Sequence, residues 1–200
     1  MVEWSLEAFR RAESVGPIVV AVPPGLEARL GEGIVVVAGG QHRAASVAAA
    51  LERVETELVA VHDAARPLVT AALIDDLINE LSARPDATGV IAAAPLTDTV
   101  KRAREQRPGK GEVPSGATIA ETVSRDLLWA AQTPQVFRFA ALREALEADP
   151  QGVAAATDEA MLVEKAGGEV LIHPSSPENL KVTTPLDLRL AELLLSGRQS

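Results

Sequence analysis

Short apolar runs alternate with amphipathic helical segments along most of this 200-residue chain. Periodicity predicts helices and strands in turn. The predicted strands are 17–22, 34–37, 58–61, 89–94, 169–173 and a short one around 180–182. The predicted helices are 2–15, a segment that buries Val47, Leu51 and Val54, 70–81 with Thr70 as N-cap, 138–148, one from Asp158 and one over 185–195. This order predicts an α/β fold with a largely parallel sheet covered by helices on both faces.

Residues 97–125 interrupt this alternation. Residues 97–102 and 117–123 each have the pattern of a strand, and the stretch between them is rich in Arg, Lys, Gly and Pro. A two-stranded ribbon is marginal in water by itself. We therefore expect a β-arm at 97–125 that packs on a second subunit, although a surface insertion with no partner is equally compatible with the sequence. The length of the chain predicts a single domain over residues 1–200, with the arm at 97–125 as an insertion in it.

Composition excludes several classes of function. A formal net charge of −9 argues against a nucleic-acid surface, which must be basic. The chain has no cysteine, so disulfides and thiolate metal sites are impossible. The apolar runs are far shorter than the roughly 20 residues of a membrane helix, and the start has no signal-peptide pattern. We expect a cytoplasmic protein without a membrane partner.

The most informative motif is HDAARP at 62–67, directly after the predicted strand 58–61. In open α/β sheets, ligands bind at the carboxyl ends of the strands. Asp63 could accept hydrogen bonds from ribose or polyol hydroxyls or reach magnesium, and Arg66 could bind a phosphate or a polyol. An internal pair between Asp63 and Arg66 that fixes the turn is the structural alternative. His62 has the position of a packed strand-end histidine.

Three further segments could carry chemistry. Gly39 and Gly40, with Ser46, follow a strand and open a helix, a place that suits an anion or simply a tight turn. Residues 157–159 resemble a helix start with Thr157 as N-cap. Lys181 lies inside an apparent apolar strand, where a lysine is costly to bury without an anion.

The sequence lacks the motifs of several enzyme classes. It contains no Ser/His/Asp arrangement, HExxH, Walker loop or GxGxxG motif. The remaining candidates are scattered Asp, Arg, Lys, Ser and Thr side chains at strand ends. Such a set fits phosphoryl or nucleotidyl transfer, in which positioning and charge neutralisation do most of the work.

Six segments in this order resemble the 2-C-methyl-D-erythritol 4-phosphate cytidylyltransferase family. They are GGQHRAASV, VHDAARPLV, APLTDTVKR, ETVSRDLLWAAQTPQVF, ATDEAMLVEKAGGEV and ENLKVTTPLDL. The resemblance implies a Rossmann-like fold and a homodimer interlocked by the arm. It also implies transfer of a cytidylyl group from CTP to methylerythritol phosphate with release of pyrophosphate, and magnesium on the triphosphate.

The resemblance also implies roles for individual residues. Gly40 and Ser46 would contact the cytosine end of CTP, and Asp63 with Arg66 would line the junction of the two substrates. Thr133 and Thr157 would hold the substrate's hydroxyls. Lys181, with Thr99 and Arg125 from the partner's arm, would grip the substrate phosphate and aim it at CTP. Gln41 stands where the family often has an acid. Which protein residues, if any, would contact the magnesium is left unknown.

One departure concerns the start of the chain. Family members begin with a strand, a glycine-rich loop carrying an arginine and a Pro-Lys pair, none of which precedes Met1 here. We therefore expect an N-terminally truncated domain that can bind its substrates, with activity near background and apolar sheet residues exposed. Two alternatives stay open: a ribitol 5-phosphate cytidylyltransferase, which shares the HDAARP signature, and a non-catalytic sugar-phosphate binding module.

Overall fold

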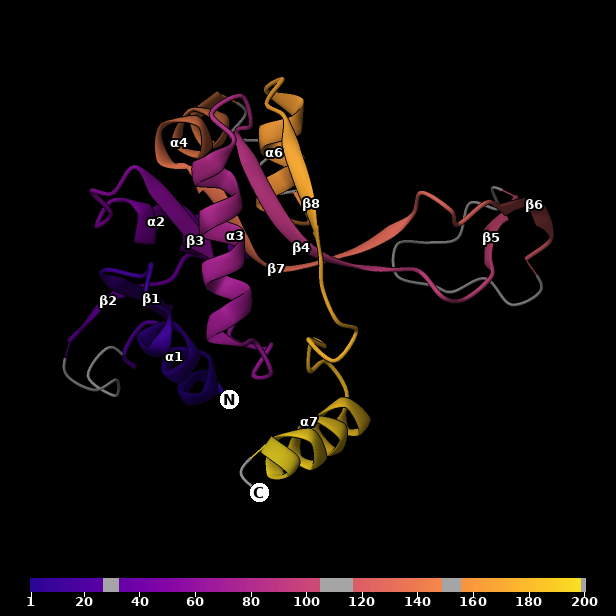
Figure 1. Cartoon of the computed structure of the whole chain (residues 1–200), viewed down its shortest axis with the longest axis horizontal. Helices are drawn as coiled ribbons and strands as arrows, with labels where there is room; N and C mark the ends of the chain where they lie inside the picture. The colour runs from indigo at the N-terminus through magenta and orange to yellow at the C-terminus, as the bar shows by residue number, and fades with distance from the viewer. Residues whose placement is uncertain (27–32, 105–116, 149–155, 199–200) are drawn as a thin grey trace.

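The computed structural model describes residues 1–26, 33–104, 117–148 and 156–198 (Figure 1). Its helices are α1 (Val2–Arg11), α2 (Arg43–Leu51), α3 (Ala71–Ala83), α4 (Phe139–Ala148), α6 (Glu159–Lys165) and α7 (Pro185–Arg198). Its strands are β1 (Ile18–Val22), β2 (Ile34–Ala38), β3 (Leu58–Val61), β4 (Gly89–Pro95), β5 (Val100–Ala103), β6 (Ile119–Val123), β7 (Trp129–Arg138) and β8 (Val170–Pro174). The α/β fold class predicted from the alternating pattern is confirmed. The first helix ends at Arg11, four residues earlier than predicted.

The central sheet is mixed, in the order β3-β7-β4-β8. β4 and β8 are parallel, but β7 runs antiparallel to both of its neighbours. The sequence Thr133-Pro134-Gln135 predicts a turn, but these residues lie inside β7, so that prediction is wrong. Pro134, which has no N–H to donate, lies where the β4–β7 register shifts between Ile91 and Ala93, and strands tolerate proline at such irregularities. The peptide bond between Thr133 and Pro134 is cis.

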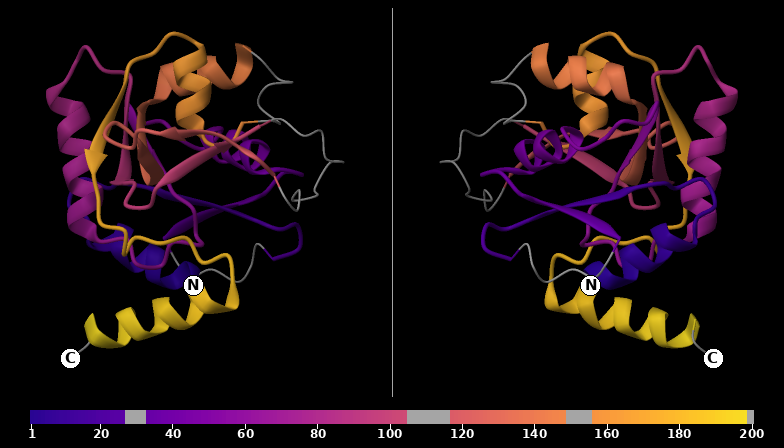
Figure 2. Two further views of the ribbon diagram at one scale, coloured as in Figure 1. Left: turned by 90° about the vertical axis from the view of Figure 1, so that its right-hand side faces the viewer. Right: turned by 90° about the vertical axis from the view of Figure 1, so that its left-hand side faces the viewer.

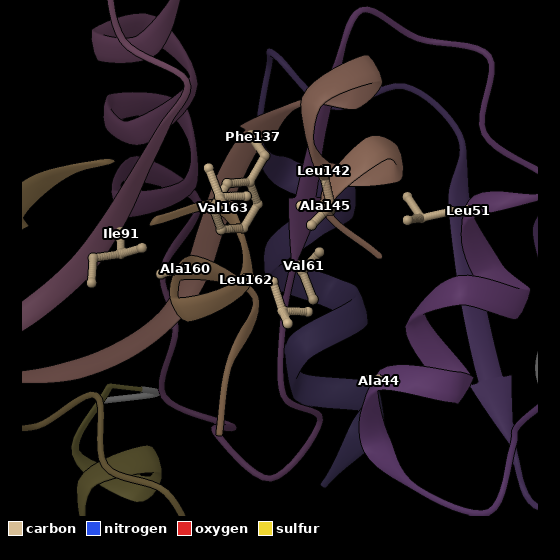
Figure 3. Packing of buried hydrophobic residues seen from close by; sticks show 10 residues of the cluster. All are labelled: Ala44, Leu51, Val61, Ile91, Phe137, Leu142, Ala145, Ala160, Leu162 and Val163. Carbon is tan, nitrogen blue, oxygen red and sulfur yellow. The ribbon is translucent and has the colours of Figure 1, made fainter. Parts of the chain in front are cut away.

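Helices cover both faces of this sheet (Figure 2). On one face, Leu77 and Leu81 of α3 pack with Val90 and Val136. α1 packs against α3. On the other face, α4 and α6 pack over Phe137, and this cluster continues to α2. Figure 3 shows its members: Ala44, Leu51, Val61, Ile91, Phe137, Leu142, Ala145, Ala160, Leu162 and Val163. Adjacent residues of one strand thus point to opposite faces, as the pleat requires.

β1 and β2 form a separate parallel pair. Within the described part of the chain, one edge of β1 and one edge of β3 have no partner strand. A cavity of about 500 Å³ is lined by both strands together with residues of α1 and α2. Its lining is mostly apolar, for example Leu6, Val19 and Val59, and its polar lining includes Arg43 and Asp63. Apolar residues of the sheet are therefore accessible from this cavity.

Two other parts lie at the periphery. β5 and β6 pair antiparallel as a two-stranded ribbon, which Figure 1 shows projecting from the body. α7 lies below the body in Figure 1, and four of its leucines are exposed: Leu186, Leu188, Leu190 and Leu193. None of the helices in the described ranges is long and apolar enough to span a membrane.

Candidate functional site

β3 delivers the HDAARP turn to the edge of the central sheet, where hydrogen bonds fix it. The His62 ring lies 3.2 Å from the Arg66 carbonyl through Nε2 and 3.0 Å from Thr133 Oγ1 through Nδ1. Burial lowers the pKa of His62 to about 4, so the ring is neutral at pH 7. Because a carbonyl only accepts, Nε2 donates to Arg66 and the Thr133 hydroxyl donates to Nδ1. His62 is thus the packed strand-end histidine that the sequence indicates.

Thr133 joins this turn to β7. Its Oγ1 accepts from the Asp63 amide at 3.0 Å while its hydroxyl proton goes to His62. The Thr133 side chain is buried, and both functions of its hydroxyl are used inside the protein. In this structure Thr133 therefore holds the backbone of Asp63, and its predicted contact with a substrate hydroxyl stays a prediction.

The Asp63 carboxylate lies between two cations. Arg43 Nε donates to Oδ1 and Lys181 Nζ donates to Oδ2, each at 2.8 Å. Burial would raise the pKa of Asp63, but the hydrogen bonds and charges of Lys181 and Arg43 lower it to about 2. Asp63 is therefore ionised at pH 7 and carries an acceptor at the edge of the sheet.

Arg43 also binds Glu159, a contact that the sequence analysis missed. Its Nη1 lies 2.5 Å and 2.6 Å from the two Glu159 oxygens. Glu159 is almost fully buried, and burial raises the pKa of its carboxyl group against the opposing effect of Arg43. Both residues are within quoted motifs, GGQHRAASV and ATDEAMLVEKAGGEV, so the motifs contained the signal although neither residue was singled out.

Lys181 reaches the site from a segment of irregular structure. The predicted strand at 180–182 is wrong, because the backbone there makes no ladder. Instead, the Val182 amide donates to the Ala65 carbonyl at 2.8 Å, and the buried Asn179 amide group donates to Gln132 and to the Thr133 carbonyl. The Lys181 side chain is 42% exposed, so its ammonium is not buried as the apolar pattern suggested. Its pairing with a carboxylate was not predicted.

Arg66 stabilises the same segment. Its Nη1 donates to the Asn179 carbonyl at 2.7 Å, and desolvation lowers the pKa of its guanidinium. Arg66 makes no ion pair with Asp63 among the described residues, so the internal pair considered as an alternative is absent there. The structure brings Asp63, Arg66 and Lys181 together at one edge of the sheet.

Gly40 and Ser46 lie beside this cluster. The Gly40 amide, on the turn that leads into α2, donates to Ser46 Oγ in the first turn of that helix at 3.0 Å. A Cβ on Gly40 would lie 2.4 Å from the Ala45 Cβ, so packing of the turn alone demands glycine there. Ser46 is on the same helix as Arg43, one turn later.

Thr157 precedes α6 but does not cap it. The N-cap is Asp158, whose Oδ1 accepts from the Met161 amide at 3.0 Å, so the predicted cap is wrong by one residue. Thr157 is exposed, and its neighbour Glu159 contacts Arg43. Its position is compatible with a substrate-facing hydroxyl.

Thr99 and Arg125 belong to the ribbon. Thr99 directly precedes β5, and Arg125, two residues beyond β6, contacts the Thr97 carbonyl. In the described part of the chain neither forms a hydrogen bond with Asp63 or Lys181. A single chain thus does not bring all predicted phosphate ligands together.

The described residues contain no group of three or more His, Asp or Glu side chains that could hold a metal. The two oxygens of Asp63 are engaged by Arg43 and Lys181, and those of Glu159 by Arg43.

A carboxylate flanked by two cations, at the edge of an α/β sheet, suits positioning and charge neutralisation of phosphorylated ligands. The fold and site are those of a nucleotidyltransferase. More particularly, the chain belongs to the IspD family of 2-C-methyl-D-erythritol 4-phosphate cytidylyltransferases, whose family model matches residues 1–197.

Relatives and solved structures agree with this family. The chain is 44% identical to the bifunctional enzyme IspD/IspF of Anaeromyxobacter dehalogenans, over 96% of this chain and 49% of that protein. It is 38% identical to the 2-C-methyl-D-erythritol 4-phosphate cytidylyltransferase of Acidobacterium capsulatum, over 98% of this chain and 83% of that protein. The crystal structure of the Thermus thermophilus cytidylyltransferase superposes with a TM-score of 0.81 at 35% identity, covering 98% of this chain and 88% of that one. The chain thus spans about half the length of the bifunctional relative.

Proposed function

We propose that this protein transfers the cytidylyl group of CTP to 2-C-methyl-D-erythritol 4-phosphate. The products are 4-diphosphocytidyl-2-C-methyl-D-erythritol and pyrophosphate, in isoprenoid biosynthesis by the non-mevalonate pathway. The observation that carries the proposal is the contact between Lys181 and Asp63, because it places a cation for a phosphate beside an acceptor for hydroxyls. Membership of the IspD family names the two substrates.

The chemistry needs little from the protein besides position and charge. A phosphate monoester is mostly dianionic near pH 7, since its second pKa is about 6. One of its oxygens attacks the α-phosphorus of CTP, a new P–O bond forms, and the bond to the bridging oxygen breaks as pyrophosphate leaves. No base is required. Lys181 is proposed to hold the attacking phosphate and Asp63 to accept from a substrate hydroxyl.

Magnesium is proposed to enter with the nucleotide. The carboxylates of this site are occupied by cations of the protein. Mg²⁺ commonly binds through substrate phosphates and water with few protein ligands. The substrate is therefore written as the magnesium complex of CTP. Because CTP is a cytoplasmic nucleotide, the proposal includes a cytoplasmic location.

A homodimer is the second part of the proposal. The isolated ribbon and the turn that follows it expose apolar side chains, with Ile119 of β6 56% exposed and Leu127 of the turn 89% exposed. Apolar surface of this kind gains free energy when a partner covers it. In a dimer joined through the ribbon, Thr99 and Arg125 of one subunit would reach the Lys181 site of the other.

The direct test is mass spectrometry after incubation with CTP, magnesium and methylerythritol phosphate. We expect the diphosphocytidyl product from the chain itself or from a version preceded by the family's first strand and glycine-rich loop. Ribitol 5-phosphate in the same assay tests the sibling activity and should give at most a minor product. Absence of the methylerythritol product from both proteins, or a preference for ribitol phosphate, would overturn the proposal.

A further inference from the structure

The two cations on Asp63 are held very differently. Arg43 donates to Asp63 through Nε and at the same time contacts both oxygens of Glu159 through Nη1. Among the described residues, Lys181 forms one side-chain hydrogen bond, with Asp63, and its side chain is 42% exposed. Arg43 is therefore fixed on two sides and Lys181 on one.

Glu159 is the rigid end of this arrangement. Its side chain is 1% exposed, so its charge depends on the Arg43 guanidinium. The start of α6 is attached to β7, because Gln135 Nε2 donates to Asp158 at 3.0 Å and its Oε1 accepts from the Ala160 amide at 3.3 Å. The planar guanidinium can engage both carboxylates at once, which the point charge of a lysine cannot do.

We propose that Glu159 is a positioning residue that locks Arg43 as the permanent counter-charge of Asp63, leaving Lys181 free to move from Asp63 to an incoming phosphate. The inference rests on the proposed function, since it assigns Lys181 to the substrate phosphate. It adds a division of roles: Arg43 keeps Asp63 ionised throughout, while Lys181 exchanges one anion for another.

Charge balance supports this exchange. With Lys181 on a phosphate, Asp63 would keep the hydrogen bond from Arg43 at Oδ1, and its Oδ2 would become available to a substrate hydroxyl. The other ionisable groups around Asp63 are His62, Arg66 and Glu159. His62 is neutral above pH of about 4, and Arg66 is held by the Asn179 carbonyl. Within this cluster Lys181 is thus the cation with the most exposed side chain and the fewest contacts.

The test is the titration of the Asp63 carboxyl carbon by NMR in the ligand-free protein. In Lys181→Ala, the pKa of Asp63 should stay below its ordinary value because Arg43 remains. In the double variant Arg43→Met with Glu159→Gln, which removes both charges of the buried pair together, it should rise above the wild-type value, because Lys181 is then the cation left on Asp63. Glu164→Gln, an exposed change on the same helix, should leave the titration as in the wild type. An Asp63 carboxyl group that titrates at its ordinary value or above in Lys181→Ala would overturn the inference.

A second measurement tests the exchange itself. Saturation with methylerythritol phosphate should raise the pKa of Asp63 to the value found in Lys181→Ala, and the double variant should bind the ligand at least about tenfold more weakly. An unchanged Asp63 titration in the saturated protein would contradict the exchange. Calorimetry with the same ligand separates the two possible failures: absence of binding rejects the proposed function, whereas binding without the change at Asp63 rejects only this inference.

Discussion

Lys181 and Asp63, 118 positions apart in the chain, meet at 2.8 Å at the edge of the central sheet. The contact depends on the backbone bond from Val182 to Ala65, which fastens the segment after β8 to the turn after β3. The site is a product of this docking, and the following predictions test it.

Replacing Lys181 should weaken binding of the sugar phosphate. A charge-assisted hydrogen bond is worth about 1.5–3 kcal/mol, so Lys181→Ala should raise the dissociation constant about tenfold to a hundredfold. Lys165→Ala, at the exposed end of α6, is the matched control and should bind like the wild type. Calorimetry with methylerythritol phosphate measures both, and equal affinities for the two variants would exclude Lys181 from the site.

Asn179 should matter for both stability and binding. Its side-chain amide is buried and donates to Gln132 and to the Thr133 carbonyl, so Asn179→Ala leaves buried acceptors unsatisfied. We expect a loss of about 1–3 kcal/mol in the free energy of unfolding and weaker binding, because Lys181 is two residues away. Urea unfolding and calorimetry provide the measurements. Wild-type binding in the folded variant would show that this segment does not position Lys181.

Acid should destabilise the protein in two separate windows. The pKa of His62 falls from 6.5 in the unfolded chain to about 4 in the folded one, so the unfolded chain binds more protons between these values. Its contribution of roughly 3 kcal/mol is complete above pH 6.5 and is lost as pH falls towards 4. The pKa of Asp63 falls from 3.8 to about 2 on folding, so its contribution is lost only as the pH falls from 3.8 towards 2.

Urea unfolding at pH 7 and pH 4.5 measures the first window. His62→Gln cannot titrate and should lose much less stability between the two pH values than the wild type. A His62 variant that loses as much as the wild type would refute the assignment of this window to His62.

The proposed dimer should depend on the apolar face of the ribbon. Ile119→Lys places a charge on a side chain that is 56% exposed in the single chain, and burial of that charge in an interface is costly. Light scattering should then report a monomer, whereas Thr118→Lys on the neighbouring exposed position should stay dimeric. A wild-type monomer at micromolar concentration would count against the dimer itself.

Mixed subunits test whether sites are shared. A heterodimer of Arg125→Ala and Lys181→Ala subunits contains one site with both wild-type side chains. It should therefore recover about half of the wild-type binding capacity, while each variant alone binds weakly. No recovery in a verified heterodimer would place Arg125 and Lys181 of the same chain in one site.

The sequence predicted the elements of this site better than their connections. Asp63 follows a buried strand, and its position at the sheet edge follows from that local pattern alone. The pairing of Arg43 with Glu159 could not be read in the same way, because each has an ordinary place in the first turn of a helix and they are 116 positions apart. Local pattern carries no information on which distant carboxylate an arginine meets.

The same reason explains the errors in the fold. Thr133 and Pro134 have the local signature of a turn, yet tertiary pairing of β7 with β3 and β4 holds them in a strand. Lys181 lies in an apolar run that pairs with no strand in the described part of the chain, so the run forms no ladder. In both places the outcome depends on partners distant in sequence.

The most direct test of the central claim is a crystal structure of the protein with methylerythritol phosphate bound. The account predicts the phosphate within hydrogen-bond distance of Lys181 Nζ, a ligand hydroxyl on Asp63 Oδ2, and Arg43 still on Glu159. A phosphate bound elsewhere, with Lys181 still paired to Asp63, would contradict it.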